Sequence, residues 1–203
     1  MANPGYIDAD GVLTDGEAYI PIATTVLTAD TATVTFTNPA DGSSTDWSQF
    51  LDLVLISVAR STSTYEYDYD YLRMSLNNST ASGVTPNFRL YLGGAAVYQD
   101  AGPNSSYWTI GTIPATGDGG SPATEFSAGV TTIHNINSGQ YKSGTSLSGS
   151  SMSASGPFSN ITSVSFASDA PLTEIDLTVA DGSLADHSSF SLFGVLPRMG
   201  AVA

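Results

Sequence analysis

Residues 51–78 read LDLVLISVARSTSTYEYDYDYLRMSLNN, and the alternation in the second half of this stretch decides the fold class. Tyrosines occupy one parity of the alternating segment and carboxylates the other: Tyr65, Tyr67, Tyr69 and Tyr71 against Glu66, Asp68 and Asp70. Successive side chains of a β-strand point to opposite faces, so this period of two predicts a strand with phenol rings on one face and carboxylates on the other. The apolar run from Leu51 to Ala59 predicts a central strand buried on both faces. The linking residues 60–64 favour antiparallel pairing of the two strands.

Further segments alternate in the same way, and no part of the chain has a sustained helical period. They are residues 33–37, 72–76, 88–92, 107–113, 130–136, 161–166, 175–179 and 190–195. About eight or nine short strands separated by turn residues predict an all-β antiparallel sandwich, and the jelly roll is the commonest eight-stranded form. The shared period predicts a core that contains Val54, Ile56, Leu72, Leu90, Phe166, Leu177 and Leu192.

The chain has 203 residues, which suits a single sandwich domain with extra arms. Proline and glycine break residues 1–30 into short apolar pieces, which predict an irregular N-terminal arm with one short strand near Ile20 to Leu27. Residues 31–196 are then the jelly-roll domain, and residues 197–203 a C-terminal tail. The Ser- and Gly-rich residues 137–160 predict a polar edge strand flanked by loops, because a domain boundary there would leave too few strands for a second core.

The charge balance disfavours several classes of partner. Nineteen Asp and Glu residues face five Lys and Arg residues, which gives a net charge of -14. The basic residues are scattered singly, so the sequence predicts binding neither to nucleic acid nor to an anionic membrane. No apolar stretch approaches the roughly eighteen residues of a membrane span, and the start MANPGYIDADG lacks the basic and apolar regions of a secretory signal. The chain has no cysteine, which excludes disulfides and thiol catalysis.

No catalytic set stands out among the polar residues. His134 and His187 each lie beside a predicted strand, and with no Gly-x-Ser-x-Gly motif they are interpreted as hydrogen-bonded surface histidines. Glu66, Asp68 and Asp70 would share a face, as the carboxylates of a glycosidase must, but neighbouring carboxylates of this kind usually form a solvated face. We therefore expect no enzyme, no cofactor and no metal site.

The tyrosine row Tyr65, Tyr67, Tyr69 and Tyr71 is the candidate interaction site. Exposed aromatic rows bind sugars by stacking and provide large contact areas in protein interfaces. One interpretation is therefore an interface with a neighbouring subunit, and another is glycan binding. The plainest interpretation is a core-facing or half-buried sheet surface with its hydroxyls at the rim. Because each acidic copy repels the others, we expect self-association to use apolar and aromatic contacts rather than salt bridges.

A strand pattern with a few fixed residues runs through VTFTNPADGSSTDWSQFLDLVLISVARS (34–61), NFRLYLGG (87–94), and ITSVSFASDA (161–170) with the ending HSSFSLFGV (187–195). This pattern resembles the jelly-roll domain of tailed-phage virion proteins. In that group a strand ending in Phe is followed by a loop, an apolar strand and an Arg-Ser pair, which Arg60 and Ser61 match. The domain closes on a Ser-Leu-Tyr-Gly strand, in which this chain has Phe193 in place of the tyrosine.

The resemblance implies a non-enzymatic virion structural protein, such as a capsid decoration, head-fibre or tail-associated fibre subunit. Its implied partners are copies of itself, most often as a homotrimer, and other virion proteins such as major capsid or tail proteins. An acidic, cysteine-free chain fits assembly in the host cytoplasm and exposure on the exterior of the capsid or tail. The main alternative is a carbohydrate-binding receptor-recognition module, an adhesin at a fibre or tail tip that binds a host surface glycan. A glycan-degrading enzyme is a third.

Overall fold

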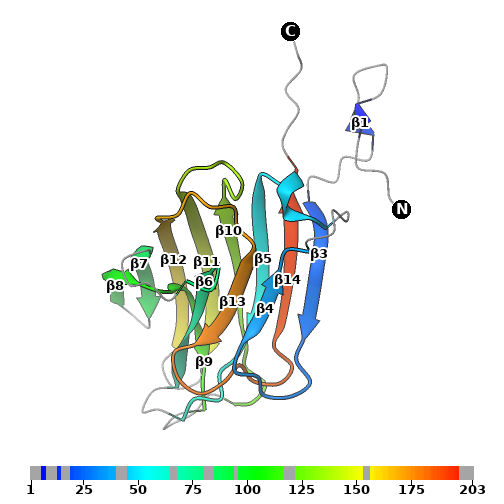
Figure 1. The fold of residues 1–203 in the computed structure, drawn as a ribbon. Helices are drawn as coiled ribbons and strands as arrows, with labels where there is room; N and C mark the ends of the chain where they lie inside the picture. The colour runs from blue at the N-terminus through cyan, green and yellow to red at the C-terminus, as the bar shows by residue number, and fades with distance from the viewer. Residues whose placement is uncertain are drawn as a thin grey trace.

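The computed structural model describes residues 6–7, 13–14, 19–39, 45–64, 68–79, 85–93, 96–116, 122–152 and 156–196. Two antiparallel sheets pack as a sandwich, which confirms the predicted fold class (Figure 1). The larger sheet has the spatial order β3 (Tyr19–Val26), β14 (Ser189–Val195), β5 (Asp52–Ala59), β10 (Ser127–His134), β11 (Lys142–Met152), β12 (Gly156–Phe166), β7 (Thr85–Gly93) and β8 (Ala96–Ser105). The smaller sheet has the order β4 (Val34–Thr37), β13 (Glu174–Val179), β6 (Tyr69–Leu76) and β9 (Trp108–Pro114).

Eight of these strands form a jelly roll. Counted along the chain, the first, eighth, third and sixth are neighbours in one sheet (β3-β14-β5-β10), and the second, seventh, fourth and fifth in the other (β4-β13-β6-β9). This order is that of two Greek keys wound together. Two hairpins are inserted between strands of the roll: β7–β8 follows β6, and β11–β12 follows β10. Both hairpins extend the larger sheet on the same side, which adds strands beyond those expected.

The core lies between the sheets and takes alternate residues from each strand. Leu72, Phe166, Leu177 and Leu192 lie in the core as predicted, and Val54 is buried although it has the same strand parity as the outward Ile56. The other two predicted core positions lie on the outer face of the larger sheet, where Ile56 is 43% exposed and Leu90 is half-buried. The prediction that the strand from Leu51 to Ala59 is buried on both faces holds for Leu53 to Leu55 and is wrong for its second half, where Ile56 and Val58 are exposed. A two-layer sandwich covers one face of each sheet, so an apolar strand of this kind leaves half of its side chains outside.

Strands β5 and β6 lie in different sheets, so the predicted antiparallel pairing between them is wrong. The linking residues cross from one sheet to the other instead of forming a hairpin turn. Their backbone hydrogen bonds go elsewhere: Ser61 N donates to Pro114 O at 2.8 Å, and Thr62 N donates to Ser183 O at 2.8 Å. The link is therefore held by the end of β9 and by the segment after β13.

The polar segment 137–160 contains two long strands, and β11 is central in its sheet rather than an edge strand. Its central inward positions, Gly144, Ser146 and Ser148, are small because β9 packs closely against them. A Cβ atom on Gly144 would lie 2.6 Å from the Trp108 ring, and Ser146 Oγ donates to Ile110 O at 2.7 Å. The serine and glycine content that resembles a loop or an edge is thus a requirement of close packing between the sheets.

The sandwich begins before residue 31. The short strand expected near Ile20 to Leu27 is present as β3, which pairs with β14 from Tyr19 to Val26 and belongs to the larger sheet. The β3 strand thus places residues 19–26, part of the segment predicted as an arm, inside the jelly roll. Within the rest of that segment, β1 (Tyr6–Ile7) pairs with β2 (Leu13–Thr14). The predicted tail 197–203 lies outside the described residues.

Candidate functional site

Two of the predicted site residues, Tyr69 and Tyr71, lie on one face of β6, and both are half-buried. Tyr65 and Tyr67 lie outside the described residues. The rings of Tyr69 and Tyr71 meet edge to face with centroids 5.8 Å apart. Tyr69 also contacts Phe158 of β12, at 5.3 Å between ring centroids, and the Arg89 guanidinium of β7 lies 4.6 Å from the centroid of Tyr71. Part of each ring is therefore used for packing within the chain.

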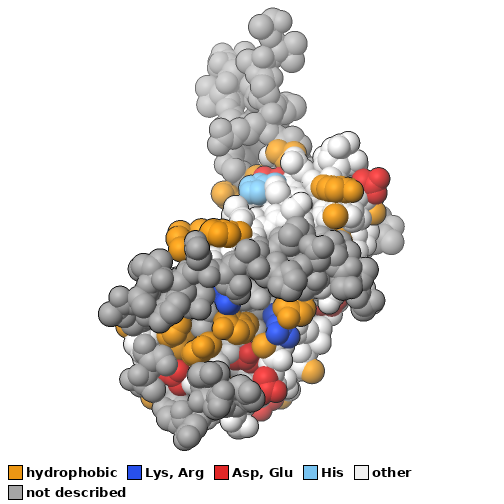
Figure 2. Space-filling model, turned by 90° about the vertical axis from the view of Figure 1, so that its left-hand side faces the viewer, with side chains coloured by type: hydrophobic (Ala, Val, Ile, Leu, Met, Phe, Trp, Pro, Cys, Tyr) orange, Lys and Arg blue, Asp and Glu red, His pale blue; other side chains and the backbone are white. Residues whose placement is uncertain are grey.

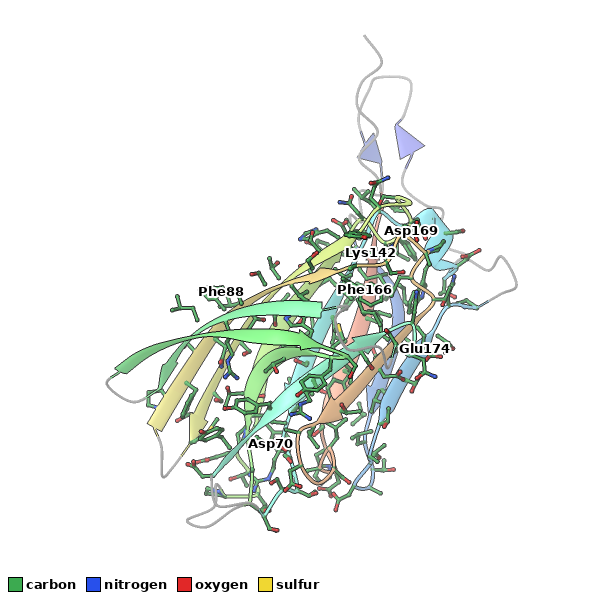
Figure 3. All side chains as sticks on the ribbon, turned by 60° about the vertical axis from the view of Figure 1, so that its left-hand side comes forward. Asp70, Phe88, Lys142, Phe166, Asp169 and Glu174 are labelled. Atoms are coloured by element: carbon green, nitrogen blue, oxygen red, sulfur yellow. The ribbon has the colours of Figure 1, made fainter. Side chains whose placement is uncertain are left out.

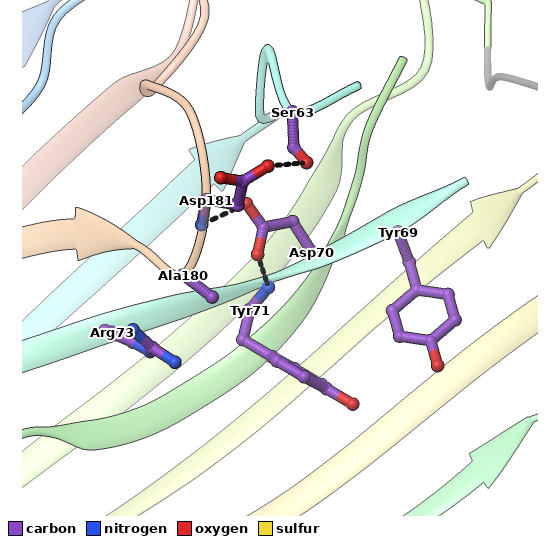
Figure 4. Close-up of a pocket in the computed structure, with 7 residues that line it drawn as sticks. All are labelled: Ser63, Tyr69, Asp70, Tyr71, Arg73, Ala180 and Asp181. Atoms are coloured by element: carbon purple, nitrogen blue, oxygen red, sulfur yellow. Dashed lines mark hydrogen bonds between the residues drawn. The ribbon is translucent and has the colours of Figure 1, made fainter. Parts of the chain in front are cut away.

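A pocket of about 320 Å³ opens beside these tyrosines (Figure 4). We call it the tyrosine pocket, and its lining residues are Ser63, Tyr69, Asp70, Tyr71, Arg73, Ala180 and Asp181. They come from β6, from the link between β5 and β6, and from the residues that follow β13. Pockets for small ligands commonly measure about 300–1,000 Å³, so this one could hold a sugar-sized molecule.

Asp70 is a buried carboxylate at the base of the tyrosine pocket, with 5% of its surface exposed. Its Oδ1 accepts a hydrogen bond from Tyr71 N at 2.6 Å. Its Oδ2 accepts hydrogen bonds from Ser61 Oγ at 2.8 Å and from Asp181 N at 3.2 Å. These donors hold the turn after β13 against the start of β6.

The expectation that Asp68 and Asp70 form a solvated face is wrong, because both side chains are buried. The face of β6 opposite the tyrosines is the inner face of the sandwich, and the same parity continues into the buried residues Leu72 and Met74. Glu66 lies outside the described residues. The predicted alternation is present in β6, and the carboxylates rather than the tyrosines lie on the inner face of the strand.

Burial raises the pKa of Asp70, while the hydrogen bonds from Ser61, Tyr71 and Asp181 and the charge of Arg73 act in the opposite direction. The native state therefore binds this proton more tightly than the unfolded state. The contribution of Asp70 to the free energy of unfolding therefore falls as the pH rises from the ordinary aspartate pKa through the raised value. We predict that Asp70→Asn abolishes this fall.

To test this prediction, the free energy of unfolding is measured by urea denaturation at several acidic pH values. The slope of this free energy against pH is then compared between the wild type and Asp70→Asn. The slope is the readout because the substitution also removes a hydrogen-bond acceptor and so lowers stability at every pH. The exposed Asp30→Asn serves as the matched control. An unchanged slope in Asp70→Asn would contradict the assignment.

Arg73 adds a cationic group to the tyrosine pocket. Its guanidinium lies 3.9 Å from the centroid of the Tyr107 ring. Its Nε is buried and has no hydrogen-bond partner within the described part of the chain. On this side of the molecule, basic side chains lie directly beside hydrophobic ones (Figure 2). Such a site offers ring faces and a hydrogen-bond donor to a polar ligand.

Both histidines pair with aspartates at the surface. His134 Nδ1 lies 3.1 Å from Asp52 Oδ2, and His187 Nε2 lies 3.4 Å from Asp186 Oδ2. His187 is largely exposed, with 79% of its side-chain surface accessible. Across the described ranges, no group of three or more His, Asp or Glu side chains is placed to hold a metal ion. The described chain likewise contains no helix long and apolar enough to cross a membrane.

No protein-family model matches this chain, and a search of curated proteins finds no match. The resemblance to phage virion proteins therefore rests on the sequence stretches quoted above.

Sequence reasoning missed a group of exposed apolar residues on the outer face of the larger sheet, among them Ile56, Val130, Leu147 and Ile161. Valine, leucine and isoleucine in alternating strands are ordinarily assigned to the core. A signal was present, however. The run from Leu51 to Ala59 is apolar on both parities, and a two-layer sandwich can bury one of them.

Proposed function

We propose that this protein is a non-enzymatic structural subunit of a tailed-bacteriophage virion, of the capsid decoration, head-fibre or tail-associated fibre type. It lies on the exterior of the capsid or tail, and it assembles with its own copies, as a trimer, and with other virion proteins. The observation that supports the proposal is where two of the phage-like stretches lie: residues 34–61 supply β4, β5 and the Arg-Ser pair, and residues 187–195 supply β14, all within the jelly roll. The other two stretches contribute β7 and β12 of the inserted hairpins.

Arg60 and Ser61, the Arg-Ser pair of the resemblance, tie segments of the roll together. Both residues are buried. The Arg60 guanidinium donates to Pro122 O and, at 3.4 Å, to Glu125 O, which fixes the segment before β10. Ser61 Oγ donates to Asp70 Oδ2 at 2.8 Å and lies 3.1 Å from Asp181 O. The pair therefore stabilises the jelly roll, which supports a structural role.

Electron microscopy of phage particles tests this proposal. Particles produced by the phage that encodes the chain are purified on a density gradient and labelled with gold-conjugated antibodies against the protein. We expect the label at a regular position on the capsid or tail and the protein in the particle fraction. Antibody pre-absorbed with the purified protein is the control. A protein that remains wholly in the soluble lysate, with unlabelled particles, would contradict the proposal.

Saccharide binding at the tyrosine pocket is the second candidate function, which would suit an adhesin at a fibre or tail tip. The pocket combines the rings of Tyr69 and Tyr71 with Arg73 and the exposed Asp181, groups that stack on and hydrogen-bond to sugars. A glycan array with the purified protein is the test. Tyr71→Ala should weaken any bound glycan by about tenfold, equivalent to about 1.4 kcal/mol, whereas Tyr141→Ala at an exposed site outside the pocket should not. An array without binding would exclude this function for the glycans tested.

A further inference from the structure

An exposed apolar row crosses the outer face of the larger sheet. The strand register places Val130 of β10 directly opposite both Ile56 of β5 and Leu147 of β11, and Leu147 opposite Ile161 of β12. The exposed fractions of Ile56, Val130, Leu147 and Ile161 are 43%, 46%, 61% and 54%. We call these four residues the outer apolar row.

The row continues beyond β12. Ile161 pairs with Leu90 of β7, and Phe88, two residues before Leu90, is 49% exposed. The Phe88 side chain projects away from the sandwich, whereas Phe166 lies within it (Figure 3). Single exposed apolar residues are normal on a protein surface, but a contiguous row across neighbouring strands marks an interaction site.

The described part of the face around the outer apolar row is almost free of charge. On β10, β11 and β12 every outward position is apolar, glycine, histidine or a small hydroxyl residue: Ala128, Val130, Thr132, His134, Ser143, Thr145, Leu147, Gly149, Ser151, Pro157, Ser159, Ile161, Ser163 and Ser165. Outward positions on the described β3, β14 and β5 add a single carboxylate, Asp52, which pairs with His134 at the rim. The chain as a whole has nineteen acidic residues, so their exclusion from this face is pronounced.

Charge decides which partner fits such a face. A basic partner would gain by meeting the acidic surfaces of this chain and would find almost no carboxylates here. A second copy carries the same charge of -14, and it can approach closely where neither surface presents carboxylates. At physiological salt, charges farther away than about 8 Å are largely screened. We infer that the outer face of the larger sheet binds the same face of a second copy, with the outer apolar row at its centre.

The size of the face agrees with such a contact. Six strands about 4.8 Å apart and about seven residues of about 3.4 Å each outline a surface of roughly 700 Å². A standard interface buries about 800 Å² on each partner. Two sheets packed face to face lie about 10 Å apart, which is the spacing at which their outward side chains interdigitate.

The order of residues along the row suits a two-fold contact. Val130 and Ile161 are β-branched residues that flank Leu147 on either side. A two-fold axis that passes beside Leu147 parallel to the strands places Leu147 against its own copy and Val130 against the partner's Ile161, in an isologous interface. The contact pairs copies whether or not another surface also forms a trimer, and it does not rest on a virion location.

Sedimentation velocity of the full chain from about 1 μM to 100 μM tests the contact, since mass action makes association depend on concentration. The double variant Leu147→Thr with Ile161→Thr keeps β-forming residues at solvent-exposed positions, so the fold should survive. Its dissociation constant should rise at least tenfold. Tyr141→Thr, at a residue 63% exposed outside the strands, is the matched control and should associate like the wild type. Equal association of the wild type and the double variant would overturn the inference, as would a wild-type monomer throughout this range.

A chemical cross-link reports the geometry directly, and the chain provides a clean background because it has no cysteine. Disulfides need Cα atoms about 4.4–6.8 Å apart, which is closer than face-to-face sheets allow, so a short bismaleimide is the probe. Leu147→Cys should cross-link to its own copy, and Thr37→Cys, at an exposed position on the outer face of the smaller sheet, should not. An oligomer whose Leu147→Cys subunits do not cross-link to one another would place the interface on another face and overturn the inference.

Discussion

Replacing Gly144 with alanine should lower the free energy of unfolding by about 1–3 kcal/mol, the usual cost of an added methyl group in a packed core. The new Cβ would lie 2.6 Å from two ring carbons of Trp108 and 3.0 Å from Val164. Trp108 cannot easily withdraw, because it is 1% exposed and its Nε1 donates to Thr162 Oγ1 at 3.2 Å. Urea unfolding of the purified variants measures the loss.

A double-mutant cycle identifies the cause of that loss. The Trp108→Leu variant, itself destabilised, lacks the far end of the indole ring. Gly144→Ala should therefore cost little in this background. The difference between its cost in the two backgrounds, the coupling energy, should be about 1–3 kcal/mol. Gly149→Ala on the same strand is the control, since the nearest atom to its new Cβ lies at an ordinary 3.8 Å. If Gly144→Ala costs the same with and without Trp108, close packing of β9 on β11 is not the reason for the small residues of β11.

Gly194→Val should be the second severe substitution, with a loss of about 2–3 kcal/mol. Gly194 is an inward position of β14, and any side chain there would overlap the ring of Phe50, which is buried in the core. For a domain of this size the loss corresponds to a fall of roughly 4–12 °C in the melting temperature. Differential scanning calorimetry of the variant gives this value.

The control for this substitution is Ser189→Val, an outward position on the same strand, which should change the melting temperature little. Phe50→Leu provides space, so Gly194→Val should be milder in that background. If Gly194→Val and Ser189→Val lower the melting temperature equally, contact with Phe50 is not the cause of the loss. The result bears on the phage-like closing strand, in which Gly194 follows Phe193.

The sequence predicted most of the strands, because many of them keep the period of two. The pairs Val34 with Phe36 and Ile175 with Leu177 are inward residues of β4 and β13, as their spacing indicated. Periodicity does not assign a strand to a sheet. Residues 60–64 therefore appeared to be a hairpin turn, whereas they cross between sheets because their hydrogen-bond partners lie far away in the chain.

The candidate site was predictable only in part, for a similar reason. Alternation separated Tyr69 and Tyr71 from Asp70 but could not show which parity faced the core. The tyrosine pocket also needs Asp181, 111 residues beyond Asp70 in the chain, where the backbone N–H of one donates to the carboxylate of the other. A contact of that range comes from the winding of the jelly roll and leaves no local signal in the sequence.

The position of β14 also sets the order in which the protein can be built. β14 lies between β3 and β5 and pairs with both, yet it follows every other described strand in the chain. During synthesis the edges of β3 and β5 that pair with β14 therefore stay unpaired until residue 195 has left the ribosome. Such long-range closure slows folding and exposes strands to aggregation in the meantime. Ribosome-bound chains stopped before β14 should therefore be sensitive to protease, and a chaperone that shields strand edges should raise the yield of folded protein.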